Sequence, residues 1–476
     1  MPLTPPDPPA VPAHPSLDED GNGIPDHGRS ASVGAELSAF TIELPDEVIS
    51  TLLKADPVKL GGSPGCRLWR TSDVLLLGSG EALRIGLPRP WARTTHTRVV
   101  TQVLSAIKAV PDDGSLDHSL IAMGALPYDP TAAGHLTVPR LLVSVPSPRL
   151  ARPWATLVTA DAGRDIAAQA KWRDSIEAEV VALAEAGDQP EAPDGFQLRS
   201  DISHSSWKEL VRRAVADMGR GALDKVVLAR RVDVVATGPF PLPETLSRLA
   251  ALYPSCAVFN FNGFIGASPE TLVRRQGDAV SSHPLAGTVA RSGDEDTDAQ
   301  LLAALTASEK DRREHQLVVD AIVDSLRPLC AVLDVPAQPA TVALRNVSHL
   351  GTNITGKLRR ERTSPTGSAR GELPTALDLA GLLQPTPAVG GHPTAAALAW
   401  QRANEGFERG CYAGPVGWVD RAGDGEWALG LRSALVSGER ATLYAGAGIV
   451  VGSDAEAELV ETQLKLQALL AALVRP

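Results

Sequence analysis

Residues 414–451 read GPVGWVDRAGDGEWALGLRSALVSGERATLYAGAGIVV, and residues 455–473 read AEAELVETQLKLQALLAAL. The first stretch holds three apolar runs separated by turn residues, which predict strands at Gly414–Val419, Glu426–Val436 and Ala441–Val451. The second stretch predicts one helix. Successive strands joined by short turns pair in an antiparallel manner. We therefore predict an α+β fold in which antiparallel sheets carry helices packed on their outside.

A glycine-rich run at 446–452, GAGIVVG, lies between the last strand and the last helix. It is superficially similar to a dinucleotide-binding fingerprint, but that motif requires a further parallel strand after the helix, and none follows here. An alternative is that Gly446 and Gly448 bring backbone N–H groups close to an anion. The segment containing Gly287 and Thr288 could offer similar donors.

The rest of the chain divides into three parts by composition and pattern. Residues 1–38 are rich in Pro, Gly, Asp and Ser, which predicts a disordered tail. Residues 39–200 alternate short apolar runs with Gly/Pro turns and form the N-terminal part of the fold. Residues 201–476 carry the motifs and form the catalytic part. Within this part, a long helix is predicted at 297–332.

Composition narrows the class of protein. Apolar residues make up 43% and charged residues 21%, and the formal net charge is −11 at pH 7. This balance is typical of a globular protein, and the absence of basic runs argues against nucleic acid as a partner. No apolar stretch is long enough to cross a membrane, and the four cysteines are scattered, so we expect a reduced, cytoplasmic protein. A small anion would need a locally positive pocket or a metal.

Two predicted helices carry carboxylates at one-face spacing. Asp311 and Glu314 are three residues apart in one of them, and Glu458, Glu461 and Lys465 follow i, i+3, i+7 in the other. Carboxylates on rigid helices suit Mg²⁺, a hard cation that needs few protein ligands. For either helix alone, a solvated face laced with ion pairs is the better explanation.

Two further residues are candidates for acid–base chemistry. Lys225 begins an apolar strand, KVVLAR, and desolvation there would favour its neutral, basic form. Glu270 follows Pro269 at the end of another apolar strand, where burial would favour a protonated carboxyl that can act as an acid. Taken singly, each also reads as an ordinary residue: a lysine reaching out to water, and an exposed turn.

Ten segments in the C-terminal part together resemble the chorismate-utilising enzymes, which include isochorismate, salicylate, anthranilate and aminodeoxychorismate synthases. The resemblance covers roughly residues 200–472, and it implies one large chorismate-binding fold. The segments are DKVVLAR (224–230), IGASPE (265–270), PLAGT (284–288), SEKDRREH (308–315), VSHL (347–350), QPTPAVGG (384–391), YAGPVGW (412–418), LRSA (431–434), AGAGIV (445–450) and ELVETQLK (458–465).

The resemblance implies roles for the acidic and basic residues. Lys225 would activate water for attack at ring carbon C2, and Glu270 would protonate the departing C4 hydroxyl. Glu314 and Glu461 would be the Mg²⁺ carboxylates, with Asp311 and Glu458 in the surrounding shell.

The same resemblance implies a substrate pocket. Gly287 and Thr288 would assist the metal in holding the ring carboxylate. Arg432 and Tyr412 would hold the enolpyruvyl carboxylate. The other residues expected to bind substrate are His349, Ala388, Val389, Gly446, Gly448 and Lys465.

Within the family, the form TPAVGG, with Ala388, is similar to the isochorismate synthases. Salicylate synthase, which adds pyruvate elimination, is the second reading, and a non-catalytic paralogue is a third. We expect chorismate as the substrate, no nucleic acid, no membrane and no glutaminase subunit, and a monomer. The product would enter menaquinone or siderophore biosynthesis.

Overall fold

The computed structural model of the chain describes residues 37–110, 119–146, 153–160, 166–185, 192–221, 223–360 and 373–474. Most of the tail predicted at 1–38 therefore lies outside the described residues. Its last residue, Ser38, already belongs to the first strand, β1 (Ser38–Glu43).

A 13-stranded sheet forms the largest layer, and among its described strands only the β1–β5 pair is parallel. In spatial order its strands are β10 (Phe196–Ser200), β11 (Lys225–Ala236), β25 (Arg440–Val450), β24 (Ser433–Ser437), β13 (Phe264–Ser268), β12 (Ala257–Phe261), β2 (Cys66–Arg70), β3 (Val74–Ser79), β8 (Leu141–Pro146), β9 (Trp154–Thr159), β1 and β5 (Lys108–Val110), with β21 (Gly391–His392) beside β11.

A nine-stranded antiparallel sheet and a small three-stranded one complete the β structure. The nine strands are, in order, β17 (Cys330–Asp334), β20 (Ile354–Leu358), β15 (Ala279–His283), β14 (Thr271–Gln276), β23 (Gly425–Leu429), β22 (Pro415–Asp420), β6 (Ile121–Ala125), β7 (Gly134–Val138) and β4 (Leu83–Leu87). The small sheet contains β16 (Leu285–Ala290), β19 (Val347–Gly351) and β18 (Ala340–Ala343).

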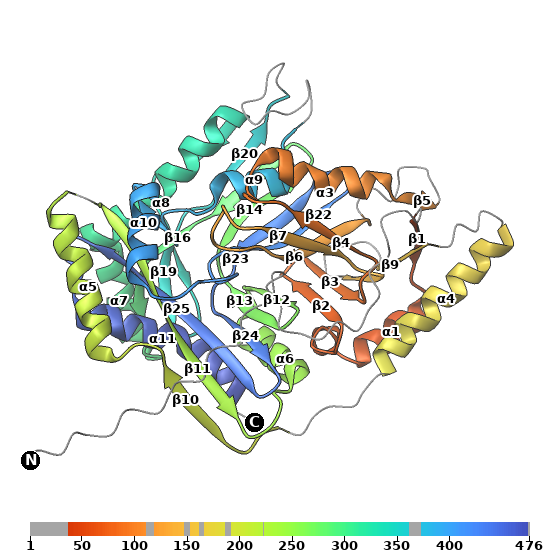
Figure 1. The fold of residues 1–476 in the computed structure, drawn as a ribbon, viewed down its shortest axis with the longest axis horizontal. Helices are drawn as coiled ribbons and strands as arrows, with labels where there is room; N and C mark the ends of the chain where they lie inside the picture. Colours follow the sequence, from red (N-terminus) through yellow and green to blue (C-terminus); the bar gives the residue numbers. More distant parts are fainter. Residues whose placement is uncertain are drawn as a thin grey trace, which may run out of the picture.

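The helices lie around the sheets (Figure 1). They are α1 (Asp46–Lys54), α2 (Pro57–Leu60), α3 (Thr94–Ala106), α4 (Ile166–Glu185), α5 (His204–Gly219), α6 (Leu242–Leu252), α7 (Glu295–Ala307), α8 (Glu309–Leu326), the 3₁₀ turn η1 (Arg327–Leu329), α9 (Ala376–Leu383), α10 (Thr394–Asn404) and α11 (Ala455–Val474). The α+β prediction, with antiparallel sheets inside and helices outside, is confirmed.

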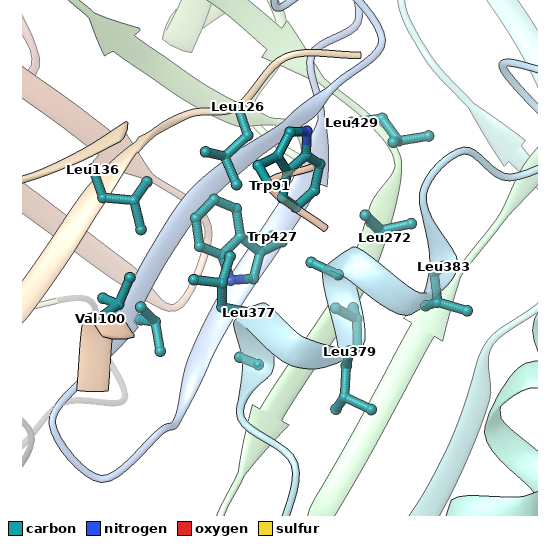
Figure 2. Packing of buried hydrophobic residues seen from close by; sticks show 14 of the residues in the cluster. Trp91, Val100, Leu126, Leu136, Leu272, Leu377, Leu379, Leu383, Trp427 and Leu429 are labelled. Carbon is teal, nitrogen blue, oxygen red and sulfur yellow. The ribbon is translucent and has the colours of Figure 1, made fainter. Parts of the chain in front are cut away.

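Both large sheets are built from both halves of the chain. In the 13-stranded sheet β12 pairs with β2, and in the nine-stranded sheet β22 pairs with β6. The largest apolar cluster lies where α3 and α9 cover the nine-stranded sheet (Figure 2). Trp91 and Trp427 are fully buried in it. Removing a side chain of this size from a core costs about 3–5 kcal/mol, so this cluster holds β23 firmly beside the site.

Two element predictions were wrong in a way that matters for the site. The single strand predicted at Glu426–Val436 is two strands in different sheets, β23 and β24. Between them Arg432 has φ 47°, a left-handed conformation that ends any extended run. The long helix predicted at 297–332 breaks at Ser308, whose side chain accepts a hydrogen bond from the Asp311 amide and caps α8.

Candidate functional site

A cavity lies where β11 and β25 of the large sheet meet β16 and β19 of the small sheet, with α8 and α11 alongside. Thirteen of the sixteen residues predicted from the sequence line it. They are Glu270, Gly287, Thr288, Glu314, His349, Ala388, Val389, Tyr412, Arg432, Gly446, Gly448, Glu461 and Lys465. The remaining three lie next to lining residues: Lys225 is beside Glu314, Asp311 is beside Gly287, and Glu458 is close enough to Glu461 to feel its charge.

Lys225 is completely buried at the start of β11, and its Nζ lies 3.0 Å from Oε1 of Glu314 on α8. The pair satisfies the distance of an ion pair, yet Nζ makes no well-directed hydrogen bond. An amine with unused hydrogen-bonding directions is poised for a further partner, such as a water molecule. The structure thus joins the predicted base to a carboxylate that was predicted to bind metal.

Gly448 explains how these two side chains fit together. It lies on β25, beside β11, and a Cβ there would come within 2.2 Å of Glu314 Oε1 and 3.1 Å of Lys225 Cε. Only glycine leaves room for both groups over the strand. The second glycine of the motif at 446–452 therefore provides the space that the Lys225–Glu314 pair occupies.

Glu270 follows β13 and is only 4% exposed. Burial raises its pKa to about 8, while the Leu285 backbone and the charges of Lys225 and Arg432 act in the opposite direction. A carboxyl with this pKa is mostly protonated at neutral pH. Glu270 can therefore donate a proton to a departing group.

Arg432 stands at the break between β23 and β24 and lines the cavity. Among the described residues no carboxylate lies within ion-pair distance of its guanidinium. Burial lowers the pKa of Arg432. The residue is half-buried, and its accessible part lies on the cavity wall. A desolvated guanidinium without a counter-ion attracts a bound anion.

His349 on β19 is held in one tautomer by its neighbours. Arg432 Nη2 lies 3.1 Å from His349 Nε2, and because a guanidinium can only donate, Nε2 must be the acceptor. Nδ1 then carries the proton and donates to the Gly287 carbonyl at 3.2 Å, with Thr288 Oγ1 at 3.1 Å. Burial and the Arg432 charge hold the pKa of His349 well below its usual range, so the ring is neutral.

Glu458 and Glu461 on α11 each have a lysine beside them. Glu461 Oε1 is 2.5 Å from Lys465 Nζ, which also donates to the Gly446 carbonyl at 2.9 Å. Glu458 Oε1 is 3.1 Å from Lys310 Nζ.

Two carboxyls in this group, Glu458 and Asp311, nevertheless have a raised pKa. Burial and the Glu461 charge raise the pKa of Glu458, and burial with the charges of Glu314 and Glu461 raises that of Asp311. Negative charge therefore accumulates where α8 and α11 meet.

The donor set fits Mg²⁺ only in part. Within the described ranges, no three His, Cys, Asp or Glu side chains are arranged to hold a metal among themselves. Two carboxylates, Glu314 and Glu461, do line the same cavity. Mg²⁺ usually takes one or two protein carboxylates and completes its shell with water and substrate oxygens. The residues present fit that mode of binding, and the crowding of negative charge favours a cation there.

Several cavity residues were missed by the sequence reasoning. Arg409 is buried and lines the cavity, but the motifs in the sequence did not include it; its one signal was Glu405, four residues earlier. Tyr444 stacks on Tyr412 with ring centroids 5.1 Å apart. Its position in an ordinary strand gave no sign of this contact. The other missed lining residues are Val227, Pro269, Leu285, Ala286, Ala413, Leu431 and Ala445.

The fold and the site define a protein whose cavity combines a guanidinium with a protonated carboxyl and has a buried amine beside it, a set of groups suited to a small organic anion. The family model described as "Chorismate binding enzyme" matches residues 68–474. The chain belongs to this family, and the resemblance noted in its motifs is confirmed.

Named relatives agree with this assignment. The salicylate biosynthesis isochorismate synthase of Pseudomonas aeruginosa is 41% identical over 271 residues, which is 56% of this chain and 54% of that protein. The isochorismate synthase DhbC of Bacillus subtilis is 38% identical over 278 residues, 56% of this chain and 67% of that one. The structure of MenF, the menaquinone-specific isochorismate synthase from Escherichia coli, has a TM-score of 0.71 at 27% identity, covering 92% of this chain and 95% of that one.

No helix among the described residues is both long enough and apolar enough to cross a membrane.

Proposed function

We propose that this protein is an isochorismate synthase, which converts chorismate to isochorismate. The observation that carries the proposal is the meeting, in one cavity, of a guanidinium with no carboxylate partner among the described residues, Arg432, and a carboxyl that is protonated at neutral pH, Glu270. The first suits a carboxylate substrate and the second suits loss of a hydroxyl group. The relatives named as isochorismate synthases support the same reaction.

The reaction needs one base and one acid. Lys225 takes a proton from water as the water oxygen bonds to ring carbon C2. The ring double bonds shift, the C4–O bond breaks, and Glu270 gives its proton to the departing hydroxyl. One water enters and one leaves, so the product is an isomer of the substrate and no oxidant is required.

The two carboxylates of chorismate find separate partners. Arg432 and the Tyr412 hydroxyl bind the enolpyruvyl carboxylate, close to the glycine backbone of β25. The backbone of Gly287 and the hydroxyl of Thr288 face the ring carboxylate, while neutral His349 links the two ends through its bonds to Arg432 and Gly287. A neutral histidine adds no competing charge between two anionic groups.

We also propose that the enzyme requires Mg²⁺, held by Glu314 and Glu461, with Asp311 and Glu458 nearby. When bound, the ion would neutralise and polarise the ring carboxylate of the substrate. The support is the pair of carboxylates on the cavity wall, together with the raised pKa values of Asp311 and Glu458, to which burial and the Glu461 charge both contribute.

The remaining expectations follow from the chemistry. Because water is the nucleophile, no glutaminase subunit is needed to supply ammonia. We propose a cytoplasmic enzyme that works as a monomer, which size-exclusion chromatography with light scattering would test.

The deciding experiment is product analysis by chromatography after the purified protein is incubated with chorismate and Mg²⁺, with a parallel sample in EDTA. Isochorismate as the sole product, formed only with Mg²⁺, is the expected result. Salicylate together with pyruvate would assign the protein to salicylate synthesis instead. Absence of any product would leave a chorismate-binding protein without this activity and would refute the proposal.

A further inference from the structure

One edge of β11 is completed by side chains rather than by a strand. Lys225 and Val226 pair with β21, and Val232–Ala236 pair with β10. Between these two stretches, the Val227 carbonyl and the Ala229 amide find side-chain partners. Val227 and Arg409 both line the cavity, so this gap is closed at the cavity wall.

Arg409 and Glu405 fill most of this gap. Glu405 Oε1 accepts the Ala229 amide at 2.8 Å, and both Glu405 oxygens pair with the Arg409 guanidinium. Arg409 Nη2 donates to the Val227 carbonyl at 2.7 Å, and Nη1 donates to the Val389 carbonyl at 2.8 Å. One planar guanidinium thereby ties strand β11 to the segment that carries Ala388 and Val389.

Two neutral side chains extend the network. Gln401 Nε2 donates to the Val227 carbonyl at 2.8 Å and to the Gly390 carbonyl at 2.7 Å. The Tyr128 hydroxyl donates to Gln401 Oε1 at 2.7 Å, and its ring lies under the Arg409 guanidinium, 4.4 Å away. All of these side chains are buried, so water cannot replace a lost bond without opening the wall.

Such an arrangement is hard to explain by stability alone. A buried ion pair costs so much desolvation that apolar residues of the same size often stabilise a fold equally well or better. What the guanidinium supplies is geometry, because its fixed fork reaches the carbonyls of two chain segments at once.

We propose that Arg409, supported by Glu405, is a positioning residue that sets the distance between Val227 and the Ala388–Val389 wall of the cavity. This inference rests on the proposed function, because it concerns the pocket in which chorismate would bind. A wall that shifts by a fraction of an ångström loosens the contacts with substrate while Lys225 and Glu270 stay in place.

The test separates positioning from stability with a double variant. In Glu405→Gln/Arg409→Met no charge is left buried without a partner, and the glutamine oxygen can still accept the Ala229 amide. We expect its Tm to lie near that of the wild type. We also expect the KM for chorismate to rise by about tenfold or more, with a smaller fall in kcat, and calorimetry to show the same loss of chorismate affinity.

Two further variants keep the test decisive. Arg409→Lys retains a charge beside Glu405 but cannot reach both carbonyls with a planar fork, so its KM should rise as well. Arg402→Met, which removes the exposed pair between Arg402 on α10 and Asp129, should leave KM unchanged.

The outcomes distinguish this inference from the proposed function. If the wild type turns over chorismate but both Arg409 variants keep its KM and its chorismate affinity within twofold, the positioning role is wrong and the proposed function stands. If the double variant does not fold, Arg409→Lys alone decides by the same criterion. A wild-type protein that neither binds nor converts chorismate would overturn the proposed function, and this inference with it.

Discussion

Arg432 and His349 meet side chain to side chain across the cavity, with Nη2 of the arginine 3.1 Å from Nε2 of the histidine. They come from different sheets: Arg432 precedes β24 of the large sheet, and His349 belongs to β19 of the small one. The contact therefore joins the two sheets at the site itself. It also orients the guanidinium, because the histidine in turn is anchored to the Gly287 carbonyl.

We expect His349→Phe to weaken substrate binding more than catalysis. The phenyl ring fills similar space but leaves one donor of Arg432 and the Gly287 carbonyl without their partner, a loss of about 1–3 kcal/mol. The KM for chorismate should rise by roughly 5- to 150-fold, since 1.4 kcal/mol is a factor of about ten. Steady-state kinetics would show this, and His392→Phe, at a half-exposed surface histidine, should not. An unchanged KM in His349→Phe would contradict the orienting role.

Lys225→Ala should abolish turnover while the fold remains. Loss of a general base lowers kcat by about 100-fold or more. Circular dichroism and thermal unfolding would check the fold, and Lys208→Ala, which breaks a surface pair with Glu456, is the matched control. Near-normal activity in Lys225→Ala would remove this lysine as the base.

Gly448→Ala should destabilise the protein and damage activity together. The added methyl group would lie 2.2 Å from Glu314 Oε1, so either the Lys225–Glu314 pair or β25 must move. Overpacking of this kind costs about 1–3 kcal/mol. Gly86→Ala is the control, because a Cβ at Gly86 meets nothing within 4 Å. A variant at 448 with wild-type Tm and kcat would show that the space above this strand is not needed.

How much of this was predictable from sequence depended on the range of the interactions. The motifs around Lys225, Glu270 and Glu314 stood out as local patterns, and the fold brings all three to one cavity or its wall. The break at Arg432 could not be seen in the sequence, because residues 426–436 read as one apolar run. In the structure the left-handed conformation of Arg432 ends β23, and β24 after it belongs to a different sheet. Arg409 also went unnoticed, since its partners at Val227 and Val389 are distant in sequence and are backbone carbonyls. A backbone carbonyl can accept a hydrogen bond whatever the side chain is, so the sequence does not show which carbonyls do so.

The pH dependence of the reaction should report Glu270. This carboxyl donates a proton only while it is protonated, and burial raises its pKa to about 8. We expect kcat/KM to be limited by the acid above that pH and to fall by about tenfold for each further pH unit. Rates measured between pH 6 and 10, with protein stability checked at each pH, would show this limb. A profile that stays level up to pH 10 would mean that another group supplies the proton.

The same residue should make stability depend on pH in a direction opposite to that of an ordinary salt-bridged carboxylate. The unfolded chain releases the Glu270 proton near pH 4.5, whereas the folded protein keeps it up to about pH 8. Between these values the folded state binds more protons, so the free energy of unfolding decreases as pH rises, by roughly 1.4 kcal/mol per pH unit at most.

The substitution Glu270→Gln removes this loss of stability. We expect the variant to have nearly wild-type Tm at pH 5 and a higher Tm than the wild type at pH 8.5, while its activity is lost. Glu439→Gln, at an exposed site, should follow the wild type at both pH values. Equal Tm values for wild type and Glu270→Gln at pH 8.5 would show that ionising the buried carboxyl does not destabilise the fold. The physical reason to expect a protonated acid at this position would then be removed.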